Sequence, residues 1–223
     1  DKRPFVYGNS YAPEGDGNID YEAVDDAFSA IQLAKNHPEL AESKIFVIGH
    51  SLGALVAPRI AERSSDLSGI VMIAGNARPF DDIILEQYEY IASIPGSGTE
   101  QKDVDEIKAQ VENARKYGTA EFDASIPFPL KMPEGYWKSI RDYKQLEVAK
   151  RLKLPIFVIQ GERDYQITME DFGIWKTTLK KNKKAVFKSY PKLNHLLHEG
   201  EGKATPNEYS IEKHIPGYVM EDI

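Results

Sequence analysis

The sequence predicts an α/β fold in which a mostly parallel sheet is flanked by helices. Four apolar runs rich in β-branched residues are typical of strands buried on both faces, at residues 44–48, 69–75, 154–161 and 185–190. Segments with helical spacing of apolar residues separate the first two runs and the last two. Strand, helix and strand in that order form a parallel unit, so residues 1–223 are expected to build a single α/β domain.

The front of the chain is predicted to hold one helix before the first strand. Residues 9–18 are rich in Asn, Gly, Pro and Ser and predict a loop. Asp20 is expected to cap the helix, and Pro38 marks its end. The apolar side chains that recur three and four residues apart in it are Tyr21, Val24, Phe28, Ile31 and Ala34.

A second helix is predicted at residues 52–63, and Pro58 is expected to bend it because proline removes a helix hydrogen bond. Residues 76–152 then predict a helical cap inserted between two parallel strands. Its helical patterns lie at residues 82–94, 101–117 and 136–152. After the cap the pattern gives the third strand, a helix at 169–181, the last strand and a polar loop at 199–206.

The junction between the first strand and the second helix places Ser51 between two glycines in the pattern G-x-S-x-G. Such a nucleophile elbow forces strained backbone angles on the serine and exposes its hydroxyl. Side chains at Gly49 or Gly53 are expected to collide across the turn. The helix begins at Leu52, so its backbone N–H is a candidate oxyanion donor. Ser51 is therefore the candidate nucleophile.

A serine hydroxyl needs a base and an orienting carboxylate, which are expected in the loops after later strands in the order Ser, Asp, His. Asp164 directly follows the third strand and His195 follows the last one. Glu162 is an alternative acid, but Asp164 is favoured because the carboxylate must reach beyond the strand end. His198 is an alternative base that could also cover the rim of the site or be solvated, and His195 is favoured because it immediately follows the exit loop of the strand.

The remaining histidines predict no metal site. His50 is expected to point into the packing of the elbow, although it is also a candidate substrate contact, and His37 and His214 are expected on the surface. No pair of histidines has a metal-ligand spacing with carboxylates, so neither a metal nor any other cofactor is expected.

The motifs GHSLG (49–53), GERD (161–164) and NHL (194–196) together resemble the α/β-hydrolase superfamily. The resemblance is greatest to the dienelactone-hydrolase and prolyl-oligopeptidase-like group of bacterial serine esterases, and it covers most of the chain outside residues 76–152. It implies that Ser51 is the nucleophile, His195 the general base and then acid, Asp164 its orienter, and the Leu52 amide one oxyanion donor. Three motifs in the right order are more specific than one.

The chain departs from that superfamily at its front. Members usually have several strands before the elbow strand, and a loop among them supplies the second oxyanion amide. Here about 44 residues precede the elbow strand, so the early strands and the second donor are expected to be missing and the chain to be a fragment of a longer protein. Residues 45–48 would then form an exposed apolar strand edge, which predicts association with a second copy of the chain.

Composition narrows the possible partners. The net charge of −7 argues against nucleic acid, and the basic cluster at residues 180–184 is typical of a solvated helix end. No apolar stretch approaches the roughly 18 residues of a membrane span, and no signal peptide is present, so a cytoplasmic location is favoured. The chain has no cysteine, which excludes disulfides.

The sequence therefore predicts a serine hydrolase that cleaves a small-molecule carboxylic ester through an acyl-enzyme. The proposed cap is rich in aromatic residues, and most of these rings are expected to pack the cap onto the body. Tyr136 and Trp137 are candidate substrate contacts. A peptidase or an acyl thioesterase with the same triad is an alternative, as is a binding protein that keeps the fold without catalysis.

Overall fold

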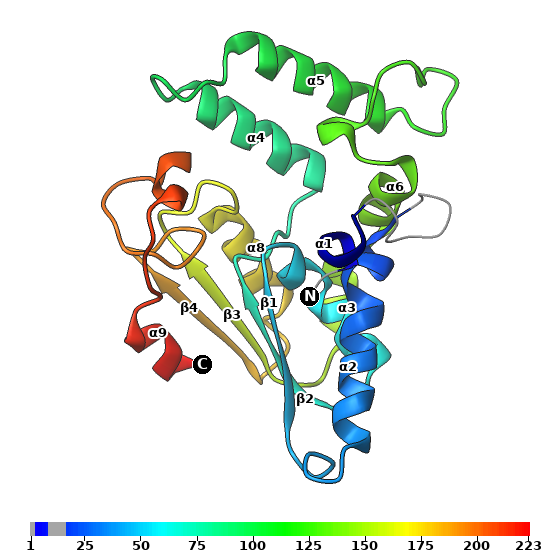
Figure 1. Ribbon diagram of the computed structural model, residues 1–223, viewed down its shortest axis with the longest axis vertical. Coiled ribbons are helices and arrows are strands. Elements are labelled where there is room, and N and C mark those ends of the chain that lie inside the picture. Colours follow the sequence, from blue (N-terminus) through cyan, green and yellow to red (C-terminus); the bar gives the residue numbers. More distant parts are fainter. Residues whose placement is uncertain (1–2, 9–16) are drawn as a thin grey trace.

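The computed structural model describes residues 3–8 and 17–223, and its centre is a parallel sheet in the strand order β1-β2-β3-β4 (Figure 1). The strands are β1 (Ile45–His50), β2 (Leu67–Ile73), β3 (Ile156–Gly161) and β4 (Ala185–Tyr190). The predicted parallel α/β fold is confirmed. The predicted loop at residues 9–18 lies almost entirely outside the described residues.

The register of the sheet brings the carboxyl ends of the strands to one edge. His50 pairs with Ile73, and Gly161 pairs with Tyr190. Because all four strands run in the same direction, the loops that follow them leave the sheet on the same side. The residues after β1, β3 and β4 are those that carry Ser51, Asp164 and His195.

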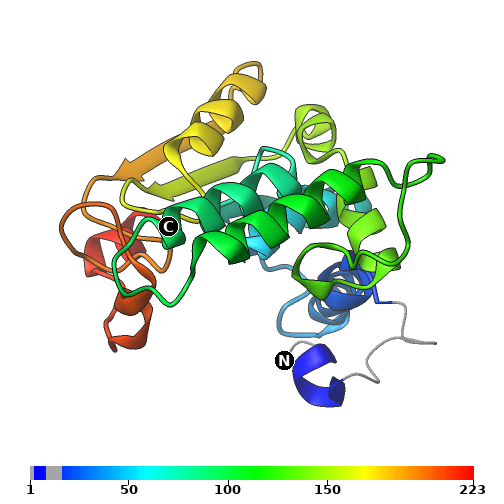
Figure 2. The same cartoon turned by 90° about the horizontal axis from the view of Figure 1, so that it is seen from above.

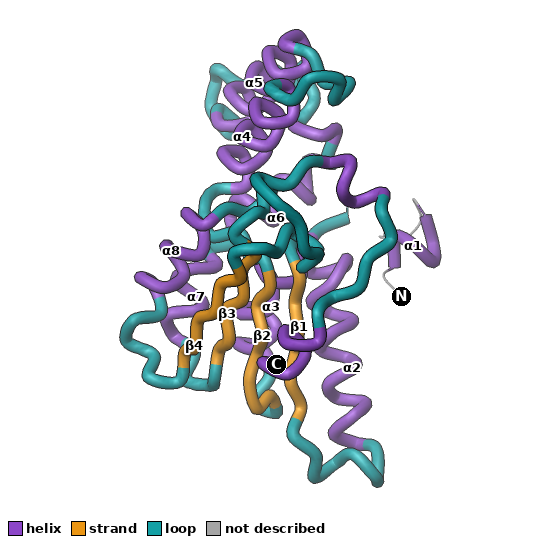
Figure 3. Tube along the Cα trace, turned by 90° about the vertical axis from the view of Figure 1, so that its left-hand side faces the viewer, coloured by secondary structure: helices purple, strands orange, loops and turns teal. Residues whose placement is uncertain are grey.

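Both faces of the two central strands are buried, which explains their uninterrupted apolar sequences. Alternate residues of β2 belong to two separate apolar clusters: Ile70 and Met72 on one face, and Val71 and Ile73 on the other. Helices α3 (Leu52–Arg63), α7 (Gln145–Arg151) and α8 (Met169–Thr178) contribute to the first cluster, and α9 (Gly217–Asp222) contributes Val219 to the second. Figure 3 shows α3, α7 and α8 beside the sheet.

The helix before the first strand begins differently from the prediction. It starts with a π-helical turn, η3 (Asp20–Val24), and continues as α2 (Asp25–Asn36). The side chain of Asn18, not Asp20, accepts the amides of Asp20 and Tyr21, each at 3.0 Å, while Asp20 forms an ion pair with Arg59 at 2.5 Å. The capping residue therefore lies two positions earlier than expected. The short helix α1 (Arg3–Tyr7) is tied to α2 by the ion pair between Arg3 and Asp26.

Between β2 and β3 lie α4 (Phe80–Ala92), α5 (Gln101–Arg115), the 3-10 turn η4 (Pro129–Lys131), α6 (Glu134–Asp142) and α7. Figures 1 and 2 show α4 and α5 side by side, projecting beyond the sheet. The single helix expected at residues 136–152 is two helices, because the chain is extended at Tyr143. Val148 and Ala149 of α7 are buried in the sheet's own cluster, so α7 belongs to the helical layer of the sheet.

The strand β1 lies at the edge of the sheet and buries less apolar surface than β2 and β3. The side chains of Phe46 and Ile48 are 53% and 56% exposed. This exposure matches the apolar strand edge that the sequence predicts. After β4, the 3-10 turn η5 (Pro206–Ser210) and α9 complete the described chain.

Candidate active site

The elbow at the end of β1 has the strained backbone that the sequence predicts. Ser51 has φ 55° and ψ −117°, a conformation that is unfavourable for a residue with a side chain. A Cβ atom on Gly49 would lie 2.2 Å from the carbonyl oxygen of Gly53, so only glycine fits there. The collision expected at Gly53 is wrong, since a Cβ atom there would meet nothing within 4 Å.

Backbone hydrogen bonds hold the elbow against the neighbouring strand and helix. The Ser51 amide donates to the Ile73 carbonyl at 2.9 Å, and the Ser51 carbonyl accepts the Ala54 amide at 2.9 Å. Leu52 is the first residue of α3, so its N–H has no helix carbonyl to bond. The start of α3 thus offers a hydrogen-bond donor beside the serine.

The loops after β3 and β4 meet through a buried pair formed by Asp164 and His195. Asp164 Oδ2 lies 2.7 Å from His195 Nδ1, and the two residues are 3% and 4% exposed. Asp164 Oδ1 also accepts the amides of Gln166 and Ile167, and Gln160 donates to Oδ2 at 3.1 Å. The Asp164 carboxyl group is thus fixed by four hydrogen-bond contacts, and its contact with His195 Nδ1 fixes the orientation of the imidazole ring.

Neither alternative residue takes part in this pair. Glu162 is exposed and accepts the hydroxyl of Ser189 at 2.7 Å. His198 is half-buried, and burial is the main cause that lowers its pKa. The structure therefore brings together Asp164 and His195.

His50 links the elbow to the loop that carries His195. Its Nε2 lies 2.8 Å from the His195 carbonyl oxygen, and the two rings have their centroids 4.7 Å apart. Desolvation, with the nearby His195 second, lowers the pKa of His50. The expectation that His50 points into the packing of the elbow is wrong, because the residue is exposed at the sheet edge. Among the described residues, no hydrogen bond joins the Ser51 hydroxyl to His195.

Sequence reasoning missed Arg163, which organises the chain beyond β4. It is 5% exposed, and its guanidinium donates to the carbonyls of Gly202 at 2.7 Å and Lys192 at 3.4 Å, and to the Glu208 carboxylate at 2.7 Å. A Cβ atom on Gly200 would lie 2.2 Å from this guanidinium, which explains the glycine. The only signal in the sequence is a charged residue adjacent to Asp164.

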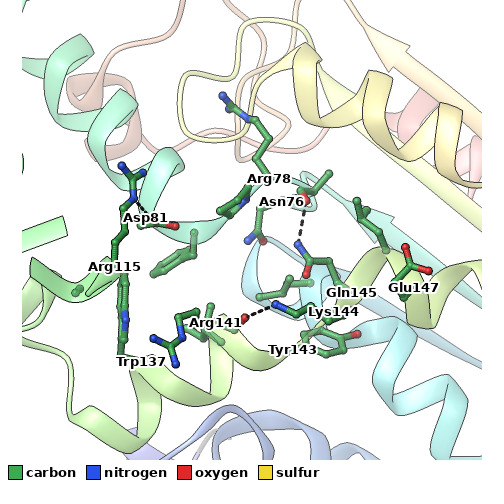
Figure 4. A pocket seen from close by; sticks show the side chains of 17 residues that line it. Asn76, Arg78, Asp81, Arg115, Trp137, Arg141, Tyr143, Lys144, Gln145 and Glu147 are labelled. Carbon is green, nitrogen blue, oxygen red and sulfur yellow. Dashed lines mark hydrogen bonds and ion pairs between the residues drawn. The ribbon is translucent and has the colours of Figure 1, made fainter. Parts of the chain in front are cut away.

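A cavity of about 420 Å³ lies where the loop after β2 meets α3, α6 and α7 (Figure 4). Leu55, one turn after Ser51 on α3, and Asn76, just beyond β2, line it. Of the two predicted aromatic contacts, Trp137 lines the cavity, whereas Tyr136 is not among its lining residues and donates its hydroxyl to Glu22.

The parallel sheet, the serine elbow and the acid–histidine pair after the last two strands define the class of α/β hydrolases. A sequence profile of the family described as serine aminopeptidase, S33 (Hydrolase_4) matches residues 7–202, so the chain belongs to this family. The resemblance to the α/β-hydrolase superfamily noted from the sequence is thereby confirmed.

Two curated relatives are similar over most of the chain. Esterase EstD of Thermotoga maritima is 34% identical over 208 residues, which are 92% of this chain and 47% of the esterase. The uncharacterized peptidase YtmA of Bacillus subtilis is 27% identical over 187 residues, which are 82% of this chain and 59% of that protein. The chain thus spans about half the length of these relatives.

Solved structures support the fold. The esterase PF2001 of Pyrococcus furiosus superposes with a TM-score of 0.50 at 21% identity, over 79% of this chain and 54% of that one. In the part of the chain that the structure describes, no helix is long and apolar enough to cross a membrane. The same residues contain no group of three or more potential metal ligands among His, Cys, Asp and Glu.

Proposed function

We propose that the whole protein is a serine hydrolase that cleaves carboxylic esters through an acyl-enzyme. The observation that carries the proposal is the buried hydrogen bond of 2.7 Å between Asp164 and His195 at the sheet edge where the strained Ser51 elbow ends. Three residue types with these roles, on three loops of one sheet edge, fit nucleophilic acyl transfer.

In this mechanism His195 Nε2 takes the Ser51 proton as the oxygen attacks the ester carbonyl. Asp164 keeps the other ring nitrogen protonated and stabilises the imidazolium that forms. The tetrahedral oxyanion receives the Leu52 N–H, and a second donor is assigned to a segment outside this chain. His195 then protonates the departing alcohol, and water releases the acid by the same steps.

Formation of the Ser51–His195 hydrogen bond is part of this proposal. In the described residues His195 is bonded to Asp164 and, through its carbonyl, to His50, and not to Ser51. The Ser51 side chain makes no capping hydrogen bond to the start of α3. Its rotation when substrate binds would bring the hydroxyl to His195 Nε2. Catalytic hydrogen bonds are often long in unliganded enzymes and tighten in the complex.

Ester cleavage is favoured over peptide cleavage by the identity of 34% to an esterase, compared with 27% to a protein named as a peptidase. The two activities share the triad and differ in their pockets. Turnover of p-nitrophenyl butyrate, of an aminoacyl p-nitroanilide and of an acyl-CoA by the whole protein separates the three reactions. A higher kcat/KM for either of the last two than for the ester would overturn the ester assignment.

The nucleophile is tested by covalent labelling of the whole protein with a fluorophosphonate. We expect stoichiometric labelling that Ser51→Ala abolishes and His195→Gln slows strongly, while Ser125→Ala, on an exposed loop, changes nothing. An unreactive Ser51 in a folded whole protein would contradict catalysis and favour a binding protein with this fold.

A further inference from the structure

The cavity between the inserted helices and the sheet combines apolar walls with cationic groups. Its walls include Leu55, Phe80, Trp137 and Ile140. Around them lie four cations, Arg78, Arg115, Arg141 and Lys144, and two acids, Asp81 and Glu147. Figure 4 shows the labelled charged side chains around the cavity, from the loop after β2, from α4 and α5, and from α6, α7 and the junction between them, with the ends of Arg78 and Glu147 pointing away from its centre.

The charges are not neutralised evenly. Arg78 forms ion pairs with Asp171 at 2.9 Å and with Glu86 at 2.6 Å. Arg115 forms an ion pair with Asp81 at 2.6 Å. Each of these cations therefore has carboxylate partners within the protein.

The remaining groups leave an excess of positive charge. The carboxylate of Glu147 forms an ion pair with Lys150 at 2.6 Å, so it does not neutralise a cation of the cavity. Among the described residues the carboxylate partner of Arg141 is its neighbour Asp142, at 3.4 Å, and its guanidinium also donates to the Tyr117 carbonyl at 3.4 Å. Among the described residues Lys144 has no carboxylate within ion-pair distance, and its ammonium donates to the Arg141 carbonyl at 3.1 Å. Lys144 and Arg141 are thus the cations of the cavity with spare capacity for an anion.

A buried polar group lies in the same cavity. Asn76 is 4% exposed, and no hydrogen bond to its side-chain amide is found among the described residues. Gln145, by contrast, already donates to the Ala77 carbonyl at 3.0 Å. The amide atoms of Asn76 are not among the fully buried unpaired atoms of the described residues, so they keep accessible surface and can bond a ligand in the cavity. In Figure 4 Asn76 and Lys144 approach the cavity from different elements.

The cavity is coupled to the elbow. Leu55 is one helical turn from Ser51, and the Ser51 amide bonds to Ile73, three residues before Asn76. Ser51 itself is not among the lining residues, so the extension of a bound molecule from Ser51 along the start of α3 into the cavity is part of the proposal that follows.

We propose that the substrate is an ester with an apolar chain that ends in a carboxylate, bound in this cavity by the Lys144 ammonium and the Asn76 amide, with Arg141 adding positive charge. This inference rests on the proposed serine-hydrolase function. The apolar walls bury the chain, and the spare donors bind its anionic end. The carboxylate belongs either to the acyl group or to the alcohol, and these two sources are separated by experiment.

The test compares matched charged and neutral esters in the whole protein. The acyl pair is p-nitrophenyl hydrogen adipate and p-nitrophenyl hexanoate, and the alcohol pair is 4-acetoxybutanoate and butyl acetate. We expect the charged member of one pair to have a kcat/KM about tenfold above its neutral partner. Lys144→Gln should remove that preference, and Lys108→Gln, an equal charge change on an exposed position of α5, should keep it.

A second measurement does not depend on turnover. Adipate should bind to the Ser51→Ala variant in calorimetry, with a Kd about tenfold weaker after Lys144→Gln and also weaker after Asn76→Leu. Equal or lower kcat/KM for the charged esters in both pairs, or adipate binding unaffected by Lys144→Gln, would overturn the inference. If none of the neutral esters shows Ser51-dependent hydrolysis, the proposed function fails, whereas adipate binding still reports on the cavity.

Discussion

The loops that carry Asp164 and His195 differ from the strand that leads to Ser51 in the contacts that hold them in place. Asp164 accepts hydrogen bonds from two backbone amides and from Gln160 and contacts His195 Nδ1, and the side chains of Asp164, Gln160 and His195 are buried. The elbow follows an edge strand whose Phe46 and Ile48 side chains are more than half exposed. The comparison indicates that the proposed acid–base half of the site is stabilised within this chain, whereas the proposed nucleophile half depends on one strand with a single neighbour.

The largest expected effect concerns the acid–base half. Asp164→Asn keeps the size of the side chain but lets His195 adopt the wrong tautomer, so kcat for an ester should fall by about 10⁴-fold. The measurement is steady-state kinetics on the whole protein, with Glu162→Gln as the matched control that leaves kcat unchanged within a factor of about two. A loss of less than tenfold in Asp164→Asn would show that Asp164 does not orient the base.

The next effect concerns the chain beyond β4. Arg163→Met should lower the free energy of unfolding by about 3 kcal/mol, because it leaves Glu208 and several backbone carbonyls without their donor. Arg151→Met removes an exposed ion pair to Glu62 at 2.5 Å and should cost less than about 1 kcal/mol. Denaturant unfolding measures both, and equal losses would contradict the anchoring role of Arg163.

The elbow that carries Ser51 can be tested by substituting Gly49 and Gly53, which lie four residues apart. Gly49→Ala should destabilise by about 3 kcal/mol or prevent folding, since its methyl group would lie 2.2 Å from the Gly53 carbonyl oxygen. Gly53→Ala meets open space inside a helix, so its stability should stay equal or rise by up to about 1 kcal/mol. Thermal unfolding decides, and similar losses at both positions would be inconsistent with this geometry.

The smallest expected effect concerns the open edge of the sheet. Ile48→Lys should change the stability of residues 1–223 by less than about 0.5 kcal/mol, because the side chain is exposed, and it should reduce self-association in sedimentation. If another segment of the whole protein covers β1, the same substitution there should cost about 2 kcal/mol or more. Unchanged self-association of residues 1–223 after Ile48→Lys would contradict the predicted association through this edge.

The sequence predicted the strands well because buried parallel strands are continuously apolar. The loops after such strands share one edge, and Ser51, Asp164 and His195 lie there, while their catalytic roles stay predictions. It failed where local patterns are ambiguous. Asn18 and Asp20 are both good caps, and the choice between them depends on the ion pair of Asp20 with Arg59, a tertiary contact. The break near Tyr143 was missed because the apolar spacing continues across it.

Other features of the fold depend on contacts between residues that are distant in the chain, which no local motif includes. The partners of Arg163 lie 29 to 45 residues away in the chain, so no short pattern predicts them. The difference between Gly49 and Gly53 requires the three-dimensional turn, since the pattern treats the two glycines alike.

The inserted helices have an apolar cluster of their own, formed by Ile84, Ile107, Ala114 and Trp137, which is separate from the two clusters of the sheet. Substitutions among these residues can reshape the cavity without disturbing the packing beneath Asp164 and His195. Only Trp137 and Ala114 of this group also line the cavity. Under the proposed function, substrate preference and bond-breaking chemistry would reside in parts of the fold that can diverge at different rates. Phe80 and Met132, which pack against both this cluster and the first cluster of the sheet, connect the two parts.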